Sequence, residues 1–104
     1  MRIYISGPIT NNPEYMEQFA KAAKTLEARG YKYINPAELN KALPDAEWED
    51  YMLVAFELLR KADAITMLTG WDKSNGAKVE RALAFVDGLP IYDMDADRFE
   101  EPAP

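Results

Sequence analysis

The chain of 104 residues contains neither cysteine nor histidine. Without cysteine it can form no disulfide, no thiolate nucleophile and no cysteine-based zinc site, and without histidine it lacks the usual acid–base group near neutral pH. Catalysis at neutral pH must therefore rest on carboxylates, tyrosines, lysines, hydroxyl groups or the backbone. The scattered carboxylates have no metal-ligand spacing, so we expect no metal site and no cofactor.

The sequence also lacks a membrane-length apolar run and any excess of positive charge. Its formal charge is −6, and five of the eighteen acidic residues lie in residues 93–104. This balance argues against nucleic acid as a partner. The N-terminal run is strand-like rather than a signal peptide, so we expect a cytoplasmic protein without membrane contact. We expect one domain over residues 1–92, followed by an acidic, mobile tail at 93–104.

Short apolar runs alternate along the chain with segments of helical periodicity. Runs typical of strands occupy residues 2–6, 31–34, 65–68 and 89–92, and helical spacing occupies residues 15–29, 48–61 and about 76–87. Asn12 is the expected cap of the first helix. Residues 37–47 are expected to be mostly surface loop, with room for a single helical turn between Pro36 and Leu43 before Pro44 breaks it. The alternation predicts an α/β fold with a doubly wound, Rossmann- or flavodoxin-like parallel sheet of four or so strands. The expected order is 2-1-3-4, with helices on both faces.

This strand order places the loops after the first and third strands at the same edge of the sheet, where open α/β folds bind ligands. The second of these loops contains Gly70 and Gly76 and enters a helix, whose free N–H groups could bind an anion or a sugar phosphate. Glu80 follows within about one turn. Spacing alone favours a solvent-exposed helix residue there, and it equally favours a core role for Tyr4 and a simple turn at residues 6–8.

Several segments resemble the nucleoside 2-deoxyribosyltransferase-like superfamily, in particular its small phage and bacterial proteins and the related 2′-deoxynucleoside 5′-phosphate N-hydrolases. The matching motifs are Ile3-Tyr4-Ile5-Ser6-Gly7-Pro8-Ile9, Asn35-Pro36-Ala37, Trp48-Glu49-Asp50-Tyr51-Met52, Ala62-Asp63-Ala64-Ile65, Gly70-Trp71 and Ser74-x-Gly76-Ala77-x-x-Glu80. They occur in the family's order between residue 2 and about residue 91. The resemblance implies a protein that cleaves or transfers the N-glycosidic bond of a deoxynucleoside or its 5′-monophosphate.

Carried over by position, the resemblance implies that Glu80 is the nucleophile, with Tyr4 as the second catalytic residue. The implied substrate-binding residues are Ser6, Gly7, Pro8, Trp71, Ser74, Asn75 and Gly76. Trp71 is either a stacking platform for a base or part of a subunit contact. Related enzymes usually carry an aspartate, associated with the leaving base, where this chain has Ala55. That departure supports the alternative of a non-catalytic protein that binds or sequesters a nucleotide with the same fold.

The expected partners are a small nucleoside or nucleotide and further copies of the chain. Members of the superfamily tend to complete their pockets with residues of a neighbouring subunit. The sequence also has large apolar side chains that one small core does not readily absorb, namely Trp48, Tyr51, Trp71 and Phe85. We therefore expect a homodimer or a higher oligomer. Trp48, Tyr51 and Met52 are interpreted as core or interface residues rather than cofactor contacts.

Overall fold

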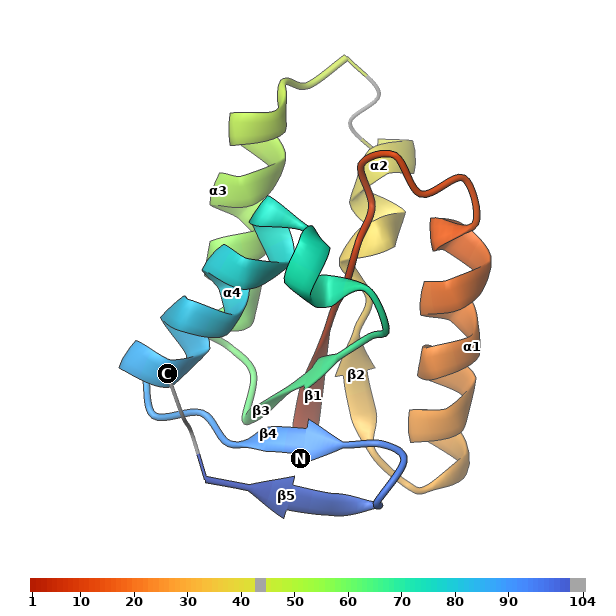
Figure 1. The fold of residues 1–104 in the computed structure, drawn as a ribbon, viewed down its shortest axis with the longest axis vertical. Helices are drawn as coiled ribbons and strands as arrows, with labels where there is room; N and C mark the ends of the chain where they lie inside the picture. Colours follow the sequence, from red (N-terminus) through yellow and green to blue (C-terminus); the bar gives the residue numbers. More distant parts are fainter. Residues whose placement is uncertain (43–44, 102–104) are drawn as a thin grey trace.

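A five-stranded sheet forms the centre of the molecule in a computed structural model that describes residues 1–42 and 45–101 (Figure 1). The strands are β1 (Arg2–Ser6), β2 (Lys32–Ile34), β3 (Ala64–Met67), β4 (Ile91–Asp93) and β5 (Arg98–Glu100). Their order is β2-β1-β3-β4-β5; the first four are parallel and β5 is antiparallel to β4. The predicted doubly wound α/β fold and the order 2-1-3-4 are confirmed.

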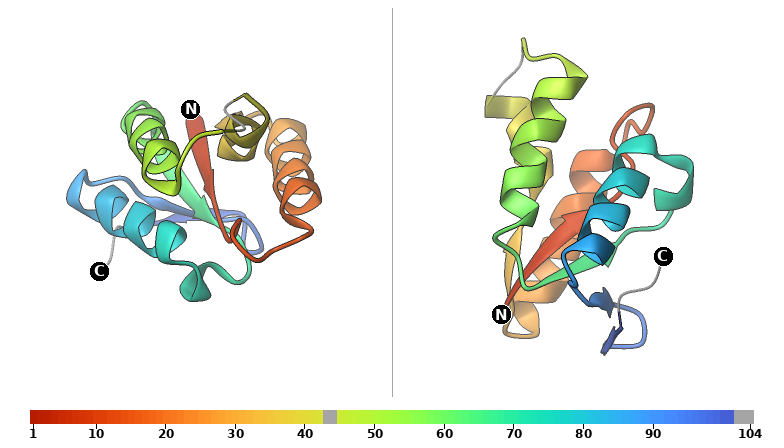
Figure 2. Two further views of the ribbon diagram at one scale, coloured as in Figure 1. Left: turned by 90° about the horizontal axis from the view of Figure 1, so that it is seen from above. Right: turned by 90° about the vertical axis from the view of Figure 1, so that its left-hand side faces the viewer.

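Helices cover both faces of the sheet (Figure 2). The helical elements are α1 (Tyr15–Ala28), η1 (Pro36–Glu38), α2 (Leu39–Ala42), α3 (Trp48–Leu59), η2 (Trp71–Lys73) and α4 (Asn75–Val86). Helix α1 packs on one face, and α3 and α4 pack on the other. Residues 36–42, expected to be mostly loop, form η1 and α2 because Oδ1 of Asn35 accepts the Ala37 N–H at 3.1 Å. Within the described residues, no helix is long and apolar enough to span a membrane.

Strand β1 is buried on both faces, and its alternate side chains enter two separate cores. Ile3 and Ile5 pack with α1, whereas Tyr4 packs with α3 and α4. Successive side chains of a strand point to opposite faces, so Ser6 shares the α4 side with Tyr4. The strand therefore presents two hydroxyl groups, both fully buried, toward α4.

Helix α4 turns a different face to the sheet from the one its apolar spacing predicts. The sequence predicts an apolar stripe of Val79, Ala82, Leu83 and Val86. The helix instead buries Ala77, Glu80 and Ala84, and it leaves Val79 44% and Val86 76% exposed. Two alanines let the helix approach the strands closely, and hydroxyl groups from β1 satisfy the glutamate between them. A search for apolar periodicity overlooks this face because a charged residue lies at its centre.

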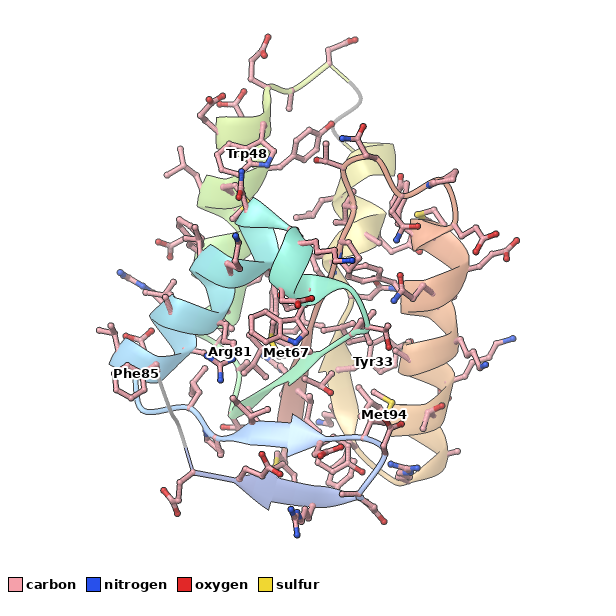
Figure 3. The ribbon with its side chains drawn as sticks, viewed as in Figure 1. Tyr33, Trp48, Met67, Arg81, Phe85 and Met94 are labelled. Carbon is pink, nitrogen blue, oxygen red and sulfur yellow. The ribbon has the colours of Figure 1, made fainter. Side chains whose placement is uncertain are left out.

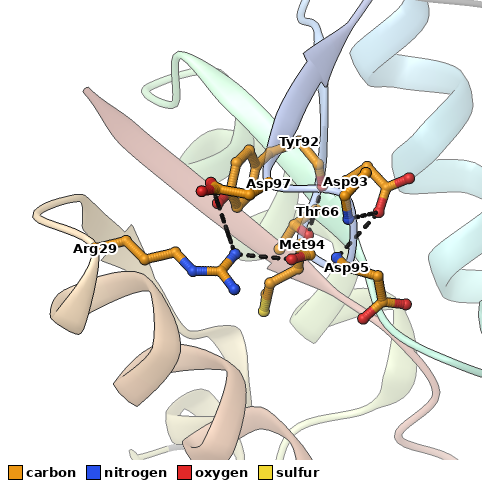
Figure 4. A network of polar contacts seen from close by, with 8 residues as sticks. Arg29, Thr66, Tyr92, Asp93, Met94, Asp95 and Asp97 are labelled. Atoms are coloured by element: carbon orange, nitrogen blue, oxygen red, sulfur yellow. Dashed lines mark hydrogen bonds and ion pairs between the residues drawn. The ribbon is translucent and has the colours of Figure 1, made fainter.

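The fifth strand comes from the segment predicted to be an acidic tail. Tyr92 anchors it, because its hydroxyl donates to Asp97 and accepts from Nη1 of Arg29 at 2.8 Å (Figure 4). Nη1 of Arg29 also donates to the Met94 carbonyl at 2.7 Å. The ring of Tyr92 lies 4.8 Å from that of Phe99, between centroids. Arg29, directly after α1, thus helps to hold the end of the described chain against β4. The sequence of Arg98–Glu100 alone could not predict this strand.

Gly7 packs closely against Leu68, the residue that follows β3. This contact gives a direct test of the packing between β1 and β3. A Cβ atom at Gly7 would lie 2.8 Å from Cβ of Leu68. We expect Gly7→Ala to lower the free energy of unfolding by about 1–3 kcal/mol, measured by urea denaturation. Gly76→Ala is the matched control, since the nearest atom there is the flexible Met52 Sδ at 3.3 Å and alanine favours a helix. Equal losses in both variants would contradict this packing.

Candidate active site

A cavity of about 710 Å³ opens at the carboxyl edge of β1 and β3. Its walls come from the loop after β1, from η1 and α2, from α3 and from the start of α4. The polar lining residues are Thr10, Asn11, Lys73, Ser74, Asn75 and Glu80, and most of the other lining side chains are aromatic or aliphatic. Ligands bind at this edge in open α/β folds because the strand order reverses between β1 and β3.

Glu80 is the buried acid of this cavity, with 6% of its surface exposed. Its Oε1 atom accepts a hydrogen bond from Oγ of Ser6 at 2.8 Å, and its Oε2 atom accepts one from the Tyr4 hydroxyl. Spacing alone predicts a solvent-exposed glutamate here, and the structure instead buries it against β1. Three residues far apart in the sequence therefore form one cluster, which we call the carboxylate clamp: Tyr4, Ser6 and Glu80.

The clamp sets the protonation of its members. Burial raises the pKa of Glu80, and the hydrogen bonds from Tyr4 and Ser6 oppose that rise without cancelling it. Burial and the charge of Glu80 raise the pKa of Tyr4 well above its ordinary value, so its phenol stays a donor. A glutamate so near the start of a helix in the sequence is predicted to be kept ionised by the helix N-terminus. Glu80 is the sixth residue of α4, beyond the first turn where the helix dipole acts, so the two hydroxyl donors favour the carboxylate instead.

The rim of the cavity at the start of α4 is suited to an anion. Ser74 caps the helix, because its Oγ atom accepts the Ala77 N–H at 3.2 Å. The N–H groups of Asn75 and Gly76 begin the helix and have no carbonyl one turn earlier within it. The Lys73 side chain adds a positive charge beside them. Helix N–H groups and an ammonium group together form a place where a phosphate can bind.

Helix α3 supplies the aromatic wall of the cavity. Trp48, Tyr51, Met52 and Ala55 line it at the i, i+3, i+4 and i+7 spacing of one helix face. The ring of Trp48 is 47% exposed and lies on α3 beside the first turns of α4 (Figure 3). Its Cζ2 atom lies 4.0 Å from where a Cβ atom of Gly76 would stand. Sequence reasoning assigned these aromatic residues to a core or an interface, although their shared stripe could have indicated a pocket wall.

Three expected substrate-binding residues, Ser6, Pro8 and Trp71, lie outside the lining of this cavity, and so does the expected catalytic residue Tyr4. Tyr4 and Ser6 are fully buried behind Glu80, to which both donate hydrogen bonds. Trp71 stacks under the guanidinium of Arg81, which is 4.9 Å from the ring centroid, and lines a second cavity of about 350 Å³ between the loops after β3 and β4. Pro8 lies against the backbone of Gly70, where an added Cβ atom would come within 3.3 Å of it. The expected residues Gly7, Ser74, Asn75 and Gly76 do line the cavity with Glu80.

Hydrogen bonds from Asn12, just before α1, and from Gln18, in α1, hold together the two loops at the rim. Nδ2 of Asn12 donates to the Pro8 carbonyl at 2.8 Å and to Oε1 of Gln18 at 2.9 Å. Nε2 of Gln18 donates to the Thr69 carbonyl at 3.0 Å, in the loop after β3. Asn12 is the predicted cap of α1, but the helix begins only at Tyr15. Oδ1 of Asn12 accepts the N–H of Glu14 at 3.2 Å, ahead of the helix, while its Nδ2 joins the loop.

Comparison with known proteins assigns the family. Residues 1–93 match the family described as Domain of unknown function (DUF4406). The chain belongs to this family. No curated protein matches the chain.

Among solved structures, this member of the DUF4406 family is similar to the 2-deoxyribosyltransferase of the psychrotolerant bacterium Bacillus psychrosaccharolyticus. The TM-score is 0.64 and the sequence identity 22%, over 88% of this chain and 69% of that one. That protein is described as a biocatalyst for the synthesis of nucleosides. The likeness shows a shared fold. In the described part of our chain, no group of three or more acidic side chains is placed to hold a metal ion.

The raised pKa of Glu80 predicts a stability that depends on pH. The protonated form stabilises the fold fully below the unfolded-state pKa, and this contribution is lost as the pH rises through the folded-state pKa. Glu80→Gln removes the titration, so we expect it to gain stability relative to the wild type as the pH rises from about 4 to about 8. Urea unfolding across that range measures the difference, with Glu57→Gln on the exposed surface of α3 as the control. A constant difference would contradict the raised pKa.

Proposed function

We propose that the chain binds a deoxynucleoside or its 5′-monophosphate in the cavity and cleaves or transfers its N-glycosidic bond. Glu80 is the nucleophile of this proposal. The observation that supports it best is the carboxylate clamp, a buried glutamate with both oxygens held by hydroxyl groups beside an anion-binding rim. The fold shared with a 2-deoxyribosyltransferase gives secondary support.

Breaking an N-glycosidic bond develops positive charge at C1′ of the sugar. A carboxylate on the face opposite the base can stabilise that charge and form a glycosyl ester, which water or a second base then resolves. Tyr4 and Ser6 orient the two carboxylate oxygens, and partial desolvation makes Glu80 a better nucleophile. The proposal therefore gives each member of the clamp a role in one step.

The rim and the clamp are separated by a distance that suits a sugar phosphate. Glu80 lies five residues after Asn75 on α4, a rise of about 7.5 Å along the helix. A phosphate at the rim would place the deoxyribose over Glu80. The base would then extend toward the wall formed by Trp48 and Tyr51.

A second candidate is a non-catalytic nucleotide-binding or sequestering protein, and Ala55 favours it. Ala55 is buried and lines the cavity, so a methyl group stands where the resemblance implies an aspartate that assists the leaving base.

The exposed rings of Trp48 and Phe85, the latter 40% exposed, are consistent with the further proposal that the chain forms a homo-oligomer (Figure 3).

Release of free base from a deoxynucleoside 5′-monophosphate separates the two candidates. We expect the wild type to release base, with kcat/KM rising as the pH passes through the raised pKa of Glu80, because only the carboxylate attacks C1′. Glu80→Gln should lower kcat by about a thousandfold or more while leaving ligand affinity nearly unchanged. Chromatography measures the released base, and Glu57→Gln serves as the control. Binding without any release by the wild type would reject the enzyme and leave the sequestering protein.

Phosphate recognition at the rim has its own test. If Lys73 and the start of α4 bind a phosphate, a monophosphate should bind more tightly than its nucleoside, with the difference shrinking as salt is added. Lys73→Gln should weaken binding of the monophosphate by about tenfold and leave binding of the nucleoside unchanged. Calorimetry with the matched pair measures both, and Lys78→Gln, exposed on α4 outside the cavity lining, is the control. Equal loss from both lysine variants would place the phosphate elsewhere.

A further inference from the structure

We propose that this site prefers N-glycosides whose base carries a positive charge, such as a quaternised purine or a pyridinium. The inference rests on the proposed function and names its substrate class. Two features of the cavity support this inference. The described lining has no carboxyl group besides Glu80, and the wall on the α3 side is aromatic and polarizable.

Cleavage of a glycosidic bond with a carboxylate nucleophile normally uses a second acid that protonates the leaving group. Among the lining residues that the structure describes, Glu80 carries the only carboxyl group. Both of its oxygens accept hydrogen bonds in the clamp, and as the nucleophile it must be ionised. It therefore has no proton to give to the base. The wall on the α3 side presents the indole of Trp48, the phenol of Tyr51, the thioether of Met52 and the methyl group of Ala55, and it has no carboxyl group. Its one protic acid is a phenol, and phenols are much weaker acids than carboxyl groups.

The same wall suits a cationic ring. Aromatic faces attract cations, and the attraction is stronger where water is partly excluded. The indole of Trp48 stands beside the first turn of α4, with the polarizable sulfur of Met52 close to Gly76 as well. The buried negative charge of Glu80 lies in the same cavity. A positively charged base would meet aromatic faces and a carboxylate together, whereas a neutral base would meet the aromatic surface alone.

The reaction balances without a general acid for such a base. The bond between C1′ and the base nitrogen breaks, and its electron pair neutralises the positive charge of the base, which leaves as a neutral molecule. A bond forms at the same time between C1′ and a carboxylate oxygen of Glu80. Water then attacks C1′ of the ester, the carboxylate is restored and one proton passes to solvent. A neutral base would instead leave as an anion or take its proton from a weak acid such as a phenol, and the lack of a well-matched general acid costs about 10²–10⁴ in rate.

A matched pair of nucleotides tests the preference. We compare 7-methyl-2′-deoxyguanosine 5′-monophosphate, at a pH where its base is cationic, with 2′-deoxyguanosine 5′-monophosphate. The release observed with Glu80→Gln is subtracted from each rate as the uncatalysed background. We expect kcat/KM to be about a hundredfold higher for the methylated nucleotide. Similar values for the two would overturn the inference and leave the proposed function standing; release from neither would overturn both.

Variants of the wall give a second readout. Ala55→Asp should raise the rate on the unmethylated nucleotide by a larger factor than the rate on the methylated one, whereas Ala55→Asn, of the same shape, should raise neither. If Ala55→Asp fails to fold, the affinities of the two nucleotides test the inference instead. Calorimetry measures both in the Glu80→Gln variant, in which the nucleotides stay intact. There the methylated nucleotide should bind about fivefold more tightly, and Trp48→Leu should abolish the difference. A preference that survives Trp48→Leu, or no preference at all, would contradict the inference.

Discussion

The hydrogen bonds from Tyr4 and Ser6 to the carboxylate of Glu80 are the interaction on which the candidate site depends. They join the central strand to α4 and place a charged group in the interior. Burying an isolated carboxylate carries a large desolvation free energy, and hydrogen bonds from two hydroxyl groups offset part of it. The small side chains of Ala77 and Ala84 on either side bring the helix close enough for these bonds to form.

Burying Glu80 in this way lowers the stability of the fold at neutral pH. Burial still raises the pKa of Glu80, so part of the desolvation cost is not recovered at neutral pH. Binding and catalytic sites commonly retain such costs, because the same desolvation makes a carboxylate reactive toward a developing positive charge. The opposite face of β1 compensates: Ile3 and Ile5 are fully buried against α1 in an apolar core.

Much of the fold could be predicted from the sequence because its strands and helices have clear periodicity. The order of the first four strands follows from the alternation of elements, and Glu80 was singled out by resemblance. The buried face of α4 could not be predicted, since its central residue is charged. Strand β5 depends on Arg29 and Tyr92, which are distant in the sequence. Trp71 packs against Arg81. The sequence spacing of a loop residue does not predict such a contact, so the position of Trp71 could not be predicted.

The central claim is that a deoxynucleoside 5′-monophosphate lies with its C1′ atom against Glu80. A crystal structure of the Glu80→Gln variant with such a nucleotide tests it most directly, because slow turnover keeps the ligand intact. We predict C1′ within about 3–3.5 Å of the side-chain oxygen at position 80, with the phosphate at the start of α4. A nucleotide bound in the second cavity beside Trp71, or bound with its sugar turned away from position 80, would contradict the account.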